Sequence, residues 1–204
     1  MTDPPRRDDR VDLISRTTPF QGYFRVDAYR LRHRRFDGGW TDEMRREVFE
    51  RGHAAAVLPY DPVRDAVVLV EQFRVGAYAA GRDPWLVEVV AGIIEPGESP
   101  DDVVRREAVE EAGCTLTELE TIGTVLLSPG GCSETLFMFC GRVDSDGVGG
   151  LHGLDHEHED IRASVVPADE ALAWLAEGKI ASAPAVMILQ WLALNRARLR
   201  AAWA

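Results

Sequence analysis

The segment around residues 99–113 constrains the fold more than any other, because both ends of a helix are encoded in it. Ser99 is a favoured N-cap residue, Pro100 suits the first helical position, and two aspartates follow in the first turn. Gly113 suits the left-handed residue that closes a helix. We therefore expect a helix from Pro100 to Ala112, with one apolar face recurring at every fourth position. The residues of that face are Val104, Ala108 and Ala112.

The same predicted helix carries three crowded carboxylates, Glu107, Glu110 and Glu111. Like charges at this spacing cost about 0.2–0.5 kcal/mol per pair, and the helix dipole disfavours negative charge near the C-terminal end. A magnesium ion would reverse both effects, because Mg²⁺ takes oxygen ligands and usually binds one or two carboxylates together with substrate phosphates. The pattern favours a magnesium site, and an exposed helix with an Arg106–Glu110 ion pair is the simpler alternative.

The rest of the chain predicts a mixed β-sheet between helices. Short apolar runs bounded by turn residues indicate buried strands, and an arginine-rich stretch of β-formers indicates an N-terminal hairpin. Strands and helices do not alternate, so we expect the α+β class, arranged as an α/β/α sandwich. The expected hairpin spans 23–36 and 44–49, the strands span 53–59, 66–72, 86–90, 121–127, 135–143 and 161–166, and further helices span 168–177 and 184–202.

Charge and composition argue against several classes of partner. The formal net charge of −11 opposes binding to nucleic acid. The longest apolar run, 183–194, has 12 residues and is too short to span a bilayer. Residues 1–10 have no apolar stretch after their charges, so we expect a disordered tail rather than a signal peptide or anchor. The three cysteines form no C-x-x-C pair, which favours reduced thiols and a cytoplasmic location.

A longer pattern surrounds the crowded carboxylates. It comprises Gly92, Glu98, Arg106, Glu107, Glu110, Glu111 and Gly113. This spacing resembles the Nudix box, G-x5-E-x7-R-E-U-x-E-E-x-G-U, at all seven fixed positions, with Ala108 and Cys114 at the U positions that are usually aliphatic. The resemblance implies the Nudix fold, with a mixed β-sheet between helices. It also implies a Nudix hydrolase domain over 51–204, preceded by an N-terminal tail and small β-hairpin subdomain over 1–50.

Segments outside the box look closest to the ADP-ribose pyrophosphatase branch of that family. Pro129 lies fifteen residues past Cys114 and is typical of enzymes that act on ADP-ribose, although its segment 128–131 alone would be an ordinary hairpin turn. Segments 45–47, 52–54, 71–74 and 156–160 are also similar to that branch. The resemblance implies Mg²⁺-dependent hydrolysis of the pyrophosphate bond of ADP-ribose to AMP and ribose 5-phosphate.

The resemblance also implies a metal site on the predicted helix, for Mg²⁺ or alternatively Mn²⁺. Glu110 is expected to be an auxiliary carboxylate. Arg106 and Glu98 are expected to brace the loop against the helix, so that they support catalysis through geometry. The residues expected to bind the metal are Glu107, Glu111 and the backbone carbonyl of Ala91.

A general base is expected on a loop well after the box, and Glu157 is our candidate by resemblance. Glu159 is its close competitor, and a solvated acidic loop is the simpler interpretation of both. His152, His156 and His158 raise the alternative of a zinc or nickel site. Oxygen ligands dominate the rest of the expected site, which weighs against that alternative.

Substrate-binding residues follow from the resemblance rather than from the pattern itself. Arg74 would contact the diphosphate, Glu134 would accept hydrogen bonds from the terminal ribose, and Ser128 belongs to the proline-containing segment. The adenine would be bound by the N-terminal hairpin of a partner subunit. This implies a homodimer with an exchanged N-terminal subdomain. The hairpin residues concerned are Tyr23, Arg46 and Glu47.

Three other functions remain open at this stage. The substrate could be another nucleotide sugar, such as ADP-glucose or GDP-mannose, since sugar pockets diverge faster than metal ligands. The chain could be a non-catalytic nucleotide-sensing module on the same fold, against which the intact carboxylates argue. It could also be an acidic protein-interaction domain, but that hypothesis leaves the spacing of the carboxylates unexplained.

Overall fold

The computed structural model describes residues 8–154, 156 and 158–204, and these form two compact units. The first unit contains the described residues up to His53 together with Leu126–Thr135. The second contains Ala54–Val125 and Leu136–Ala204. The expected tail at residues 1–7 and the candidate base Glu157 lie outside the described residues.

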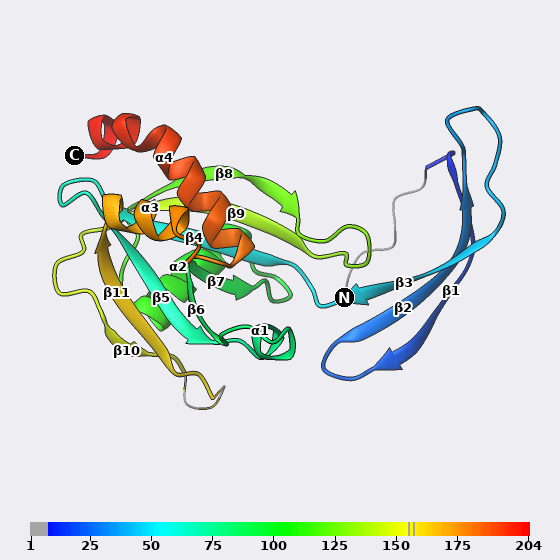
Figure 1. The fold of residues 1–204 in the computed structure, drawn as a ribbon, viewed down its shortest axis with the longest axis horizontal. Helices are drawn as coiled ribbons and strands as arrows, with labels where there is room; N and C mark the ends of the chain where they lie inside the picture. The colour runs from blue at the N-terminus through cyan, green and yellow to red at the C-terminus, as the bar shows by residue number, and fades with distance from the viewer. Residues whose placement is uncertain (1–7, 155, 157) are drawn as a thin grey trace. The chain divides into compact units, whose positions relative to one another are not determined.

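Among its described residues, the first unit holds a three-stranded antiparallel sheet in the order β1-β2-β3 (Figure 1). The strands are β1 (Val11–Gln21), β2 (Arg25–His33) and β3 (Met44–Glu50). The expected hairpin corresponds to β2 and β3, whereas β1 was not predicted. Its apolar side chains are largely exposed and do not alternate with polar ones, so the strand lacks the usual signal of a buried face.

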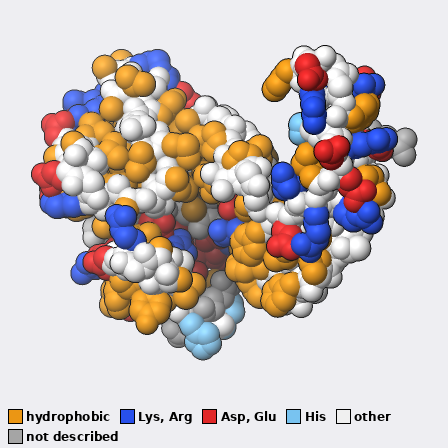
Figure 2. Space-filling view, turned by 45° about the vertical axis from the view of Figure 1, so that its right-hand side comes forward, with side chains coloured by type: hydrophobic (Ala, Val, Ile, Leu, Met, Phe, Trp, Pro, Cys, Tyr) orange, Lys and Arg blue, Asp and Glu red, His pale blue; other side chains and the backbone are white. Residues whose placement is uncertain are grey.

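Charge dominates the interior of this small sheet. Asp27 is fully buried, accepts a 2.7 Å hydrogen bond from the Thr18 hydroxyl and is paired with Arg16. Arg and acidic side chains are interspersed over the outer surface (Figure 2), with surface pairs such as Arg30–Glu43. The unit is therefore held together by the strand ladders and ion pairs more than by an apolar core.

The described residues of the second unit form a mixed sheet in the order β10-β11-β5-β4-β9-β8, with β6 paired to β5 and β7 paired to β4. Strand β4 runs parallel to β9 and antiparallel to β5 and β7. The strands are β4 (Ala54–Asp61), β5 (Ala66–Phe73), β6 (Trp85–Glu88), β7 (Val90–Ile93), β8 (Glu118–Leu126), β9 (Thr135–Arg142), β10 (Gly150–His152) and β11 (Ile161–Pro167).

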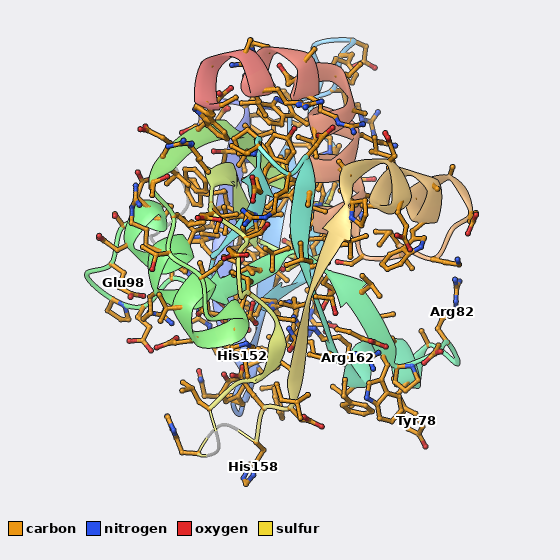
Figure 3. The ribbon with its side chains drawn as sticks, turned by 90° about the vertical axis from the view of Figure 1, so that its left-hand side faces the viewer. Tyr78, Arg82, Glu98, His152, His158 and Arg162 are labelled. Atoms are coloured by element: carbon orange, nitrogen blue, oxygen red, sulfur yellow. The ribbon has the colours of Figure 1, made fainter. Side chains whose placement is uncertain are left out.

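Helices cover both faces of this sheet, which confirms the expected α/β/α arrangement. Helix α2 (Pro100–Ala112) packs on β4, β5, β7 and β11. Helix α3 (Ala168–Ala176) packs on β5, β11 and α4 (Ala183–Trp203), and Figure 3 shows α2 and α3 on opposite sides of the sheet. Every residue of β4 is buried, because a central strand covered on both faces presents no side to water.

In the second unit the predicted bounds agree with the observed elements to within three residues, except at three places. The predicted strand at 86–90 is wrong as a single strand, because the chain leaves the β5 edge after Glu88 and begins to pair with β4 at Val90. Helix α1 (Val75–Ala79) and strand β10 were not predicted, since five and three residues are too few to show a period. Among the described helices, none is long and apolar enough to cross a membrane.

Candidate active site

Both ends of helix α2 are capped, which fixes where the helix begins and ends and so fixes the positions of its carboxylates. The Ser99 hydroxyl accepts from the Asp102 backbone N–H, and the Asp102 carboxylate accepts from the Ser99 N–H, so the two form a capping box. Gly113 closes the helix in the left-handed conformation, with φ of 62°. Val104, Ala108 and Ala112 are fully buried, as the four-residue period predicted.

Arg106 joins three of the carboxylates around this helix. Its Nε and Nη2 donate to the two oxygens of Glu98 at 3.0 and 3.2 Å, which ties the preceding loop to the helix. Its Nη1 donates to Glu107 at 2.7 Å and to Glu110 at 2.9 Å. The hydrogen bonds to Glu98, followed by those to the helix carboxylates, raise the pKa of Arg106. The Glu98–Arg106 contact expected from the sequence is therefore present, and the simpler expectation of an Arg106–Glu110 pair is also met.

Glu111 is the most enclosed of the helix carboxylates. Its Oε2 accepts from the backbone N–H of Ala91 at 3.0 Å, and its Oε1 accepts from the Gln72 side chain at 3.2 Å. Burial raises the pKa of Glu111 to about 8, although both hydrogen bonds act in the opposite direction. Burial thus disfavours the ionised form of Glu111, and a bound cation would stabilise that form.

Glu107 lies one turn earlier and is also largely buried. Burial raises its pKa to about 7, the Arg106 charge lowers it, and the charges of Glu110 and Glu159 raise it again. A Cβ atom built on Gly92 would lie 1.8 Å from Glu107 Oε1. Residue 92 must therefore be glycine for Glu107 to occupy this position, which gives the first residue of the box a steric cause.

The acidic loop between β10 and β11 runs beside the C-terminal end of α2. The Gly153 N–H donates to the backbone carbonyl of Glu110 at 3.3 Å, and Glu159 Oε2 accepts from the Leu154 N–H at 3.2 Å. Because the Glu159 charge affects the pKa of Glu107, this carboxylate lies within electrostatic reach of the helix cluster. The described residues Gly153, Leu154 and Glu159 of this loop are thus held next to the carboxylates.

The chemistry of the donors fits a hard divalent cation. Glu111 is buried and Glu107 is largely buried, burial raises the pKa of both carboxylates, and Mg²⁺ binds through one or two carboxylates while water and substrate oxygens complete its coordination. Among the residues that the structure describes, no group of three His, Cys, Asp or Glu side chains is arranged to hold a metal ion. The His152 ring contacts the Gly149 carbonyl at 3.1 Å, and Figure 3 shows His158 at the outer tip of its loop.

The expected diphosphate contact, Arg74, follows β5 in the second unit. Its Nε donates to Glu88 Oε2 on β6 at 2.6 Å. Gln72 and Arg74 are two residues apart and act on the same helix residue: Gln72 through a hydrogen bond, and Arg74 through a charge that lowers the pKa of Glu111. Sequence reasoning missed both Gln72 and Glu88 as contributors to this site. For Gln72 the available signals were its place in segment 71–74, which resembles the ADP-ribose pyrophosphatase branch, and a lone amide next to the apolar run of β5.

The remaining expected substrate residues lie in the first unit. Tyr23 is 88% exposed and stacks edge-on against Phe24. Arg46 and Glu47 lie on β3, where the Arg46 guanidinium donates to the Arg45 carbonyl and Glu47 pairs with Arg45 at 2.7 Å.

The segment Leu126–Thr135 is fixed to the end of β3 within the same unit. The Phe49 N–H donates to the Gly131 carbonyl at 2.8 Å, and the Ser133 hydroxyl donates to Glu50 at 2.6 Å. Glu134 is buried, and its carboxylate lies 3.5 Å from Arg51. The carbonyl of Ser128 accepts from two backbone N–H groups of the turn that follows it. Ser128 and Glu134 are therefore held by the strand that also carries Arg46 and Glu47.

Known proteins are similar to this chain in sequence and in fold. The NUDIX domain family model matches residues 50–187, so the chain belongs to the Nudix family. It is 51% identical to an ADP-ribose pyrophosphatase of Escherichia coli (strain K12), over 95% of this chain and 93% of that protein. It is 32% identical to a GDP-mannose pyrophosphatase of Pectobacterium atrosepticum, over 88% of this chain and 92% of that protein.

A solved structure described as an ADP compounds hydrolase superposes with a TM-score of 0.67. The match covers 94% of this chain and 98% of that one, at 18% sequence identity. This likeness extends the agreement to the fold and, together with the family match, confirms the Nudix architecture expected from the box.

Proposed function

We propose that this Nudix pyrophosphohydrolase cleaves the pyrophosphate bond of ADP-ribose in a Mg²⁺-dependent reaction and releases AMP and ribose 5-phosphate. The observation that carries the proposal is the pair of carboxylates on α2, the largely buried Glu107 and the buried Glu111, with pKa values raised by burial. Two relatives that are 51% and 42% identical over 95% of this chain bear the name ADP-ribose pyrophosphatase, which supports the substrate.

The reaction must overcome the repulsion between a nucleophile and the negative pyrophosphate oxygens. Bound Mg²⁺ would neutralise that charge, ionise a water and orient the phosphates, and Mn²⁺ is the alternative ion. Glu107 and Glu111 would hold the cation together with the Ala91 carbonyl, and Glu110 would assist them. Arg106 would keep Glu98, Glu107 and Glu110 in place, because its guanidinium is fully engaged with these carboxylates.

Removal of a proton from the attacking water is assigned to Glu157, with Glu159 as the alternative. The tether of this loop to α2 at Gly153 supports a base from this segment. Replacing each glutamate by glutamine distinguishes the two. We expect Glu157→Gln to lower kcat more than it changes KM. A larger loss of kcat in Glu159→Gln would transfer the role to that residue.

Recognition of the substrate is assigned to residues of both units. Arg74 would contact the diphosphate, Glu134 would accept hydrogen bonds from the terminal ribose, and Ser128 of the proline-containing segment would also bind the substrate. Tyr23, Arg46 and Glu47 would contact the adenine of the site in a partner subunit, which requires a homodimer with exchanged N-terminal segments over residues 1–50. The free thiols of Cys114, Cys132 and Cys140 support the cytoplasm as the compartment.

The test is hydrolysis of ADP-ribose with and without Mg²⁺, with ADP-glucose and GDP-mannose in parallel and the products separated by chromatography. We expect AMP to form preferentially from ADP-ribose and only with the metal. The control is Glu111→Gln, which should reduce turnover by orders of magnitude while the protein stays folded. Faster turnover of GDP-mannose would replace the substrate, an outcome for which the GDP-mannose pyrophosphatase relative provides a reason. No turnover of any compound would favour a nucleotide-sensing module.

A further inference from the structure

Gln72 is a polar side chain in a strand that is otherwise built for the core. Five of the first six residues of β5 are apolar and buried, and Gln72 follows with only 6% of its surface exposed. A buried amide is costly unless its polar atoms find partners. The Gln72 Nε2 donates to Glu111 Oε1 at 3.2 Å. This strand therefore directs a buried donor at a carboxylate of the candidate metal site.

The position of Gln72 in the strand makes the contact specific. Side chains two residues apart share one face of a strand, so Val68, Val70 and Gln72 lie on the same face of β5. Val68 and Val70 belong to the core cluster that includes apolar residues of α2. The amide replaces the next apolar residue at the point where the facing helix residue is Glu111.

Two neutral donors from two strands hold the Glu111 carboxylate. The Ala91 N–H on β7 binds Oε2 at 3.0 Å, while Gln72 on β5 binds Oε1 at 3.2 Å. With one donor on each oxygen, rotation of the carboxylate is restricted, yet each oxygen keeps a further lone pair. Glu107 and Glu110 differ, because their donor is the charged Arg106. Among the described residues, the groups that donate hydrogen bonds to Glu111 are neutral, so its negative charge stays available to a cation.

We propose that Gln72 is a positioning residue for the metal site, whose amide fixes the orientation of Glu111 so that the remaining lone pairs converge on the cation. The inference rests on the proposed metal-dependent function. A donor behind a metal ligand sets the ligand's direction, and losing such a donor commonly weakens metal affinity by about 10–100-fold. A side chain that only fills space in β5 would have no such effect.

The test measures Mn²⁺ binding to the substrate-free protein by electron paramagnetic resonance titration, alongside steady-state kinetics with ADP-ribose. Gln72→Met keeps the length of the side chain and removes the donor. We expect its Kd for Mn²⁺ to rise by about 10-fold or more. We also expect kcat to fall at sub-saturating metal while KM for ADP-ribose changes little.

Ser145→Ala is the matched control, because it also removes a buried side-chain hydrogen bond from the second unit. The Ser145 hydroxyl donates to Asp61 at 2.7 Å, away from the helix carboxylates. We expect this variant to lower the melting temperature and to leave the Kd for Mn²⁺ unchanged. If both variants lose Mn²⁺ affinity equally, the effect is general destabilisation and the inference is overturned.

The outcomes separate the inference from the function on which it rests. Wild-type Mn²⁺ affinity and kcat in Gln72→Met would remove the positioning role and leave the proposed hydrolase intact. A wild-type protein that neither binds Mn²⁺ nor hydrolyses ADP-ribose would remove both. If Gln72→Met is recovered unfolded, Gln72→Asn keeps an amide but withdraws the donor by one methylene. The same loss of Mn²⁺ affinity is expected there, and wild-type affinity would overturn the inference.

Discussion

Glu107 and Glu111 are the same residue type one helical turn apart, yet the structure gives them different surroundings. Glu107 accepts a hydrogen bond from the charged guanidinium of Arg106, whereas the described donors to Glu111 are the neutral groups of Ala91 and Gln72. Burial raises the pKa of both side chains, and the rise is larger for Glu111. Thus the two carboxylates that the sequence presents as equivalent are distinguished by the strands on which α2 packs.

Gly92→Ala tests whether the position of Glu107 matters. The added Cβ would lie 1.8 Å from Glu107 Oε1, so the carboxylate must move. We expect ADP-ribose hydrolysis to fall by orders of magnitude, and the free energy of unfolding to fall by about 1–3 kcal/mol, as is usual for overpacking. Enzyme assays and urea denaturation measure the two effects.

Gly76→Ala provides the control for that substitution. A Cβ on Gly76 in α1 meets no atom within 4 Å, so this variant should keep wild-type activity. A Gly92→Ala protein with wild-type turnover would show that hydrolysis does not depend on where Glu107 lies.

The surroundings of Asp61 predict how the free energy of unfolding changes at low pH. Burial raises the pKa of this carboxyl, but hydrogen bonds from the backbone and side chains of Arg64 and Ser145 outweigh it and hold the pKa well below its usual range. A lowered native pKa contributes stability that is present above the unfolded value, about 3.9, and is lost as the pH falls through the native value. Asp61→Asn should therefore lower the free energy of unfolding by about 1–3 kcal/mol at pH 7.

The pH dependence separates this effect from loss of packing. The difference between Asp61→Asn and the wild-type protein should shrink as the pH falls below about 4, since the Asp61 carboxyl of the unfolded wild-type chain then takes up a proton while the native carboxylate stays ionised. Urea denaturation of both proteins between pH 2.5 and 7 measures this difference in the free energy of unfolding. Asp144→Asn is the control, because Asp144 also pairs with Arg64 but is 79% exposed, and exposed pairs contribute about 0–1 kcal/mol. A constant difference across this pH range would contradict the assignment to ionisation.

At the scale of elements, the residues of helix α2 that stabilise the fold and those proposed to act in catalysis lie at different ends of the helix. Its N-terminal end carries the capping box, whereas the box carboxylates lie in the later turns. Ser99→Ala should lower the free energy of unfolding by about 1 kcal/mol, because the Asp102 N–H loses its acceptor. The value of kcat/KM should stay close to wild type. Ser99→Thr, which keeps the hydroxyl, is the control, and a large loss of kcat/KM in Ser99→Ala would show that the cap also positions the site.

The same helix shows what the sequence could and could not predict. Its bounds were predictable because Ser99, Pro100 and Gly113 are local signals, and its role followed from the family pattern. The Gln72–Glu111 contact was not predictable, since it joins positions 39 residues apart in sequence and depends on how β5 faces α2. The split at Val89 was missed for a similar reason, because the change of partner strand is decided by pairing and leaves no local mark.

At the scale of the whole molecule, the described residues of the first unit bury too few apolar side chains to stabilise that unit by apolar burial alone. Among its described residues, Ala28 is the one fully enclosed apolar side chain, and the acidic Asp27 is buried beside it. Several apolar side chains of this unit are exposed, including Phe20 and Tyr23. Small three-stranded sheets usually need a covered apolar face. A second copy of the chain would supply such a cover, which supports the proposed homodimer.

Complementation between two variants with different defects tests this proposal. Glu111→Gln removes the metal site of its own subunit, and Tyr23→Ala weakens the adenine contact that the subunit would give to its partner. If the N-terminal segment reaches across, a mixed dimer contains one site with an intact Glu111 and the partner's intact Tyr23. Mixing the two variants after reversible unfolding should therefore restore activity, up to one active site in each mixed dimer.

A contact within one subunit predicts the opposite result. In that case each subunit of the mixed dimer keeps its own defect, so activity would equal the average of the two variants. Light scattering must first show a dimer, because a monomer would exclude an exchanged segment. A Tyr23→Phe protein mixed with Glu111→Gln is the control, since it keeps the aromatic ring and removes only the hydroxyl. Restoration that depends on the ring would assign the stacking contact to the partner subunit.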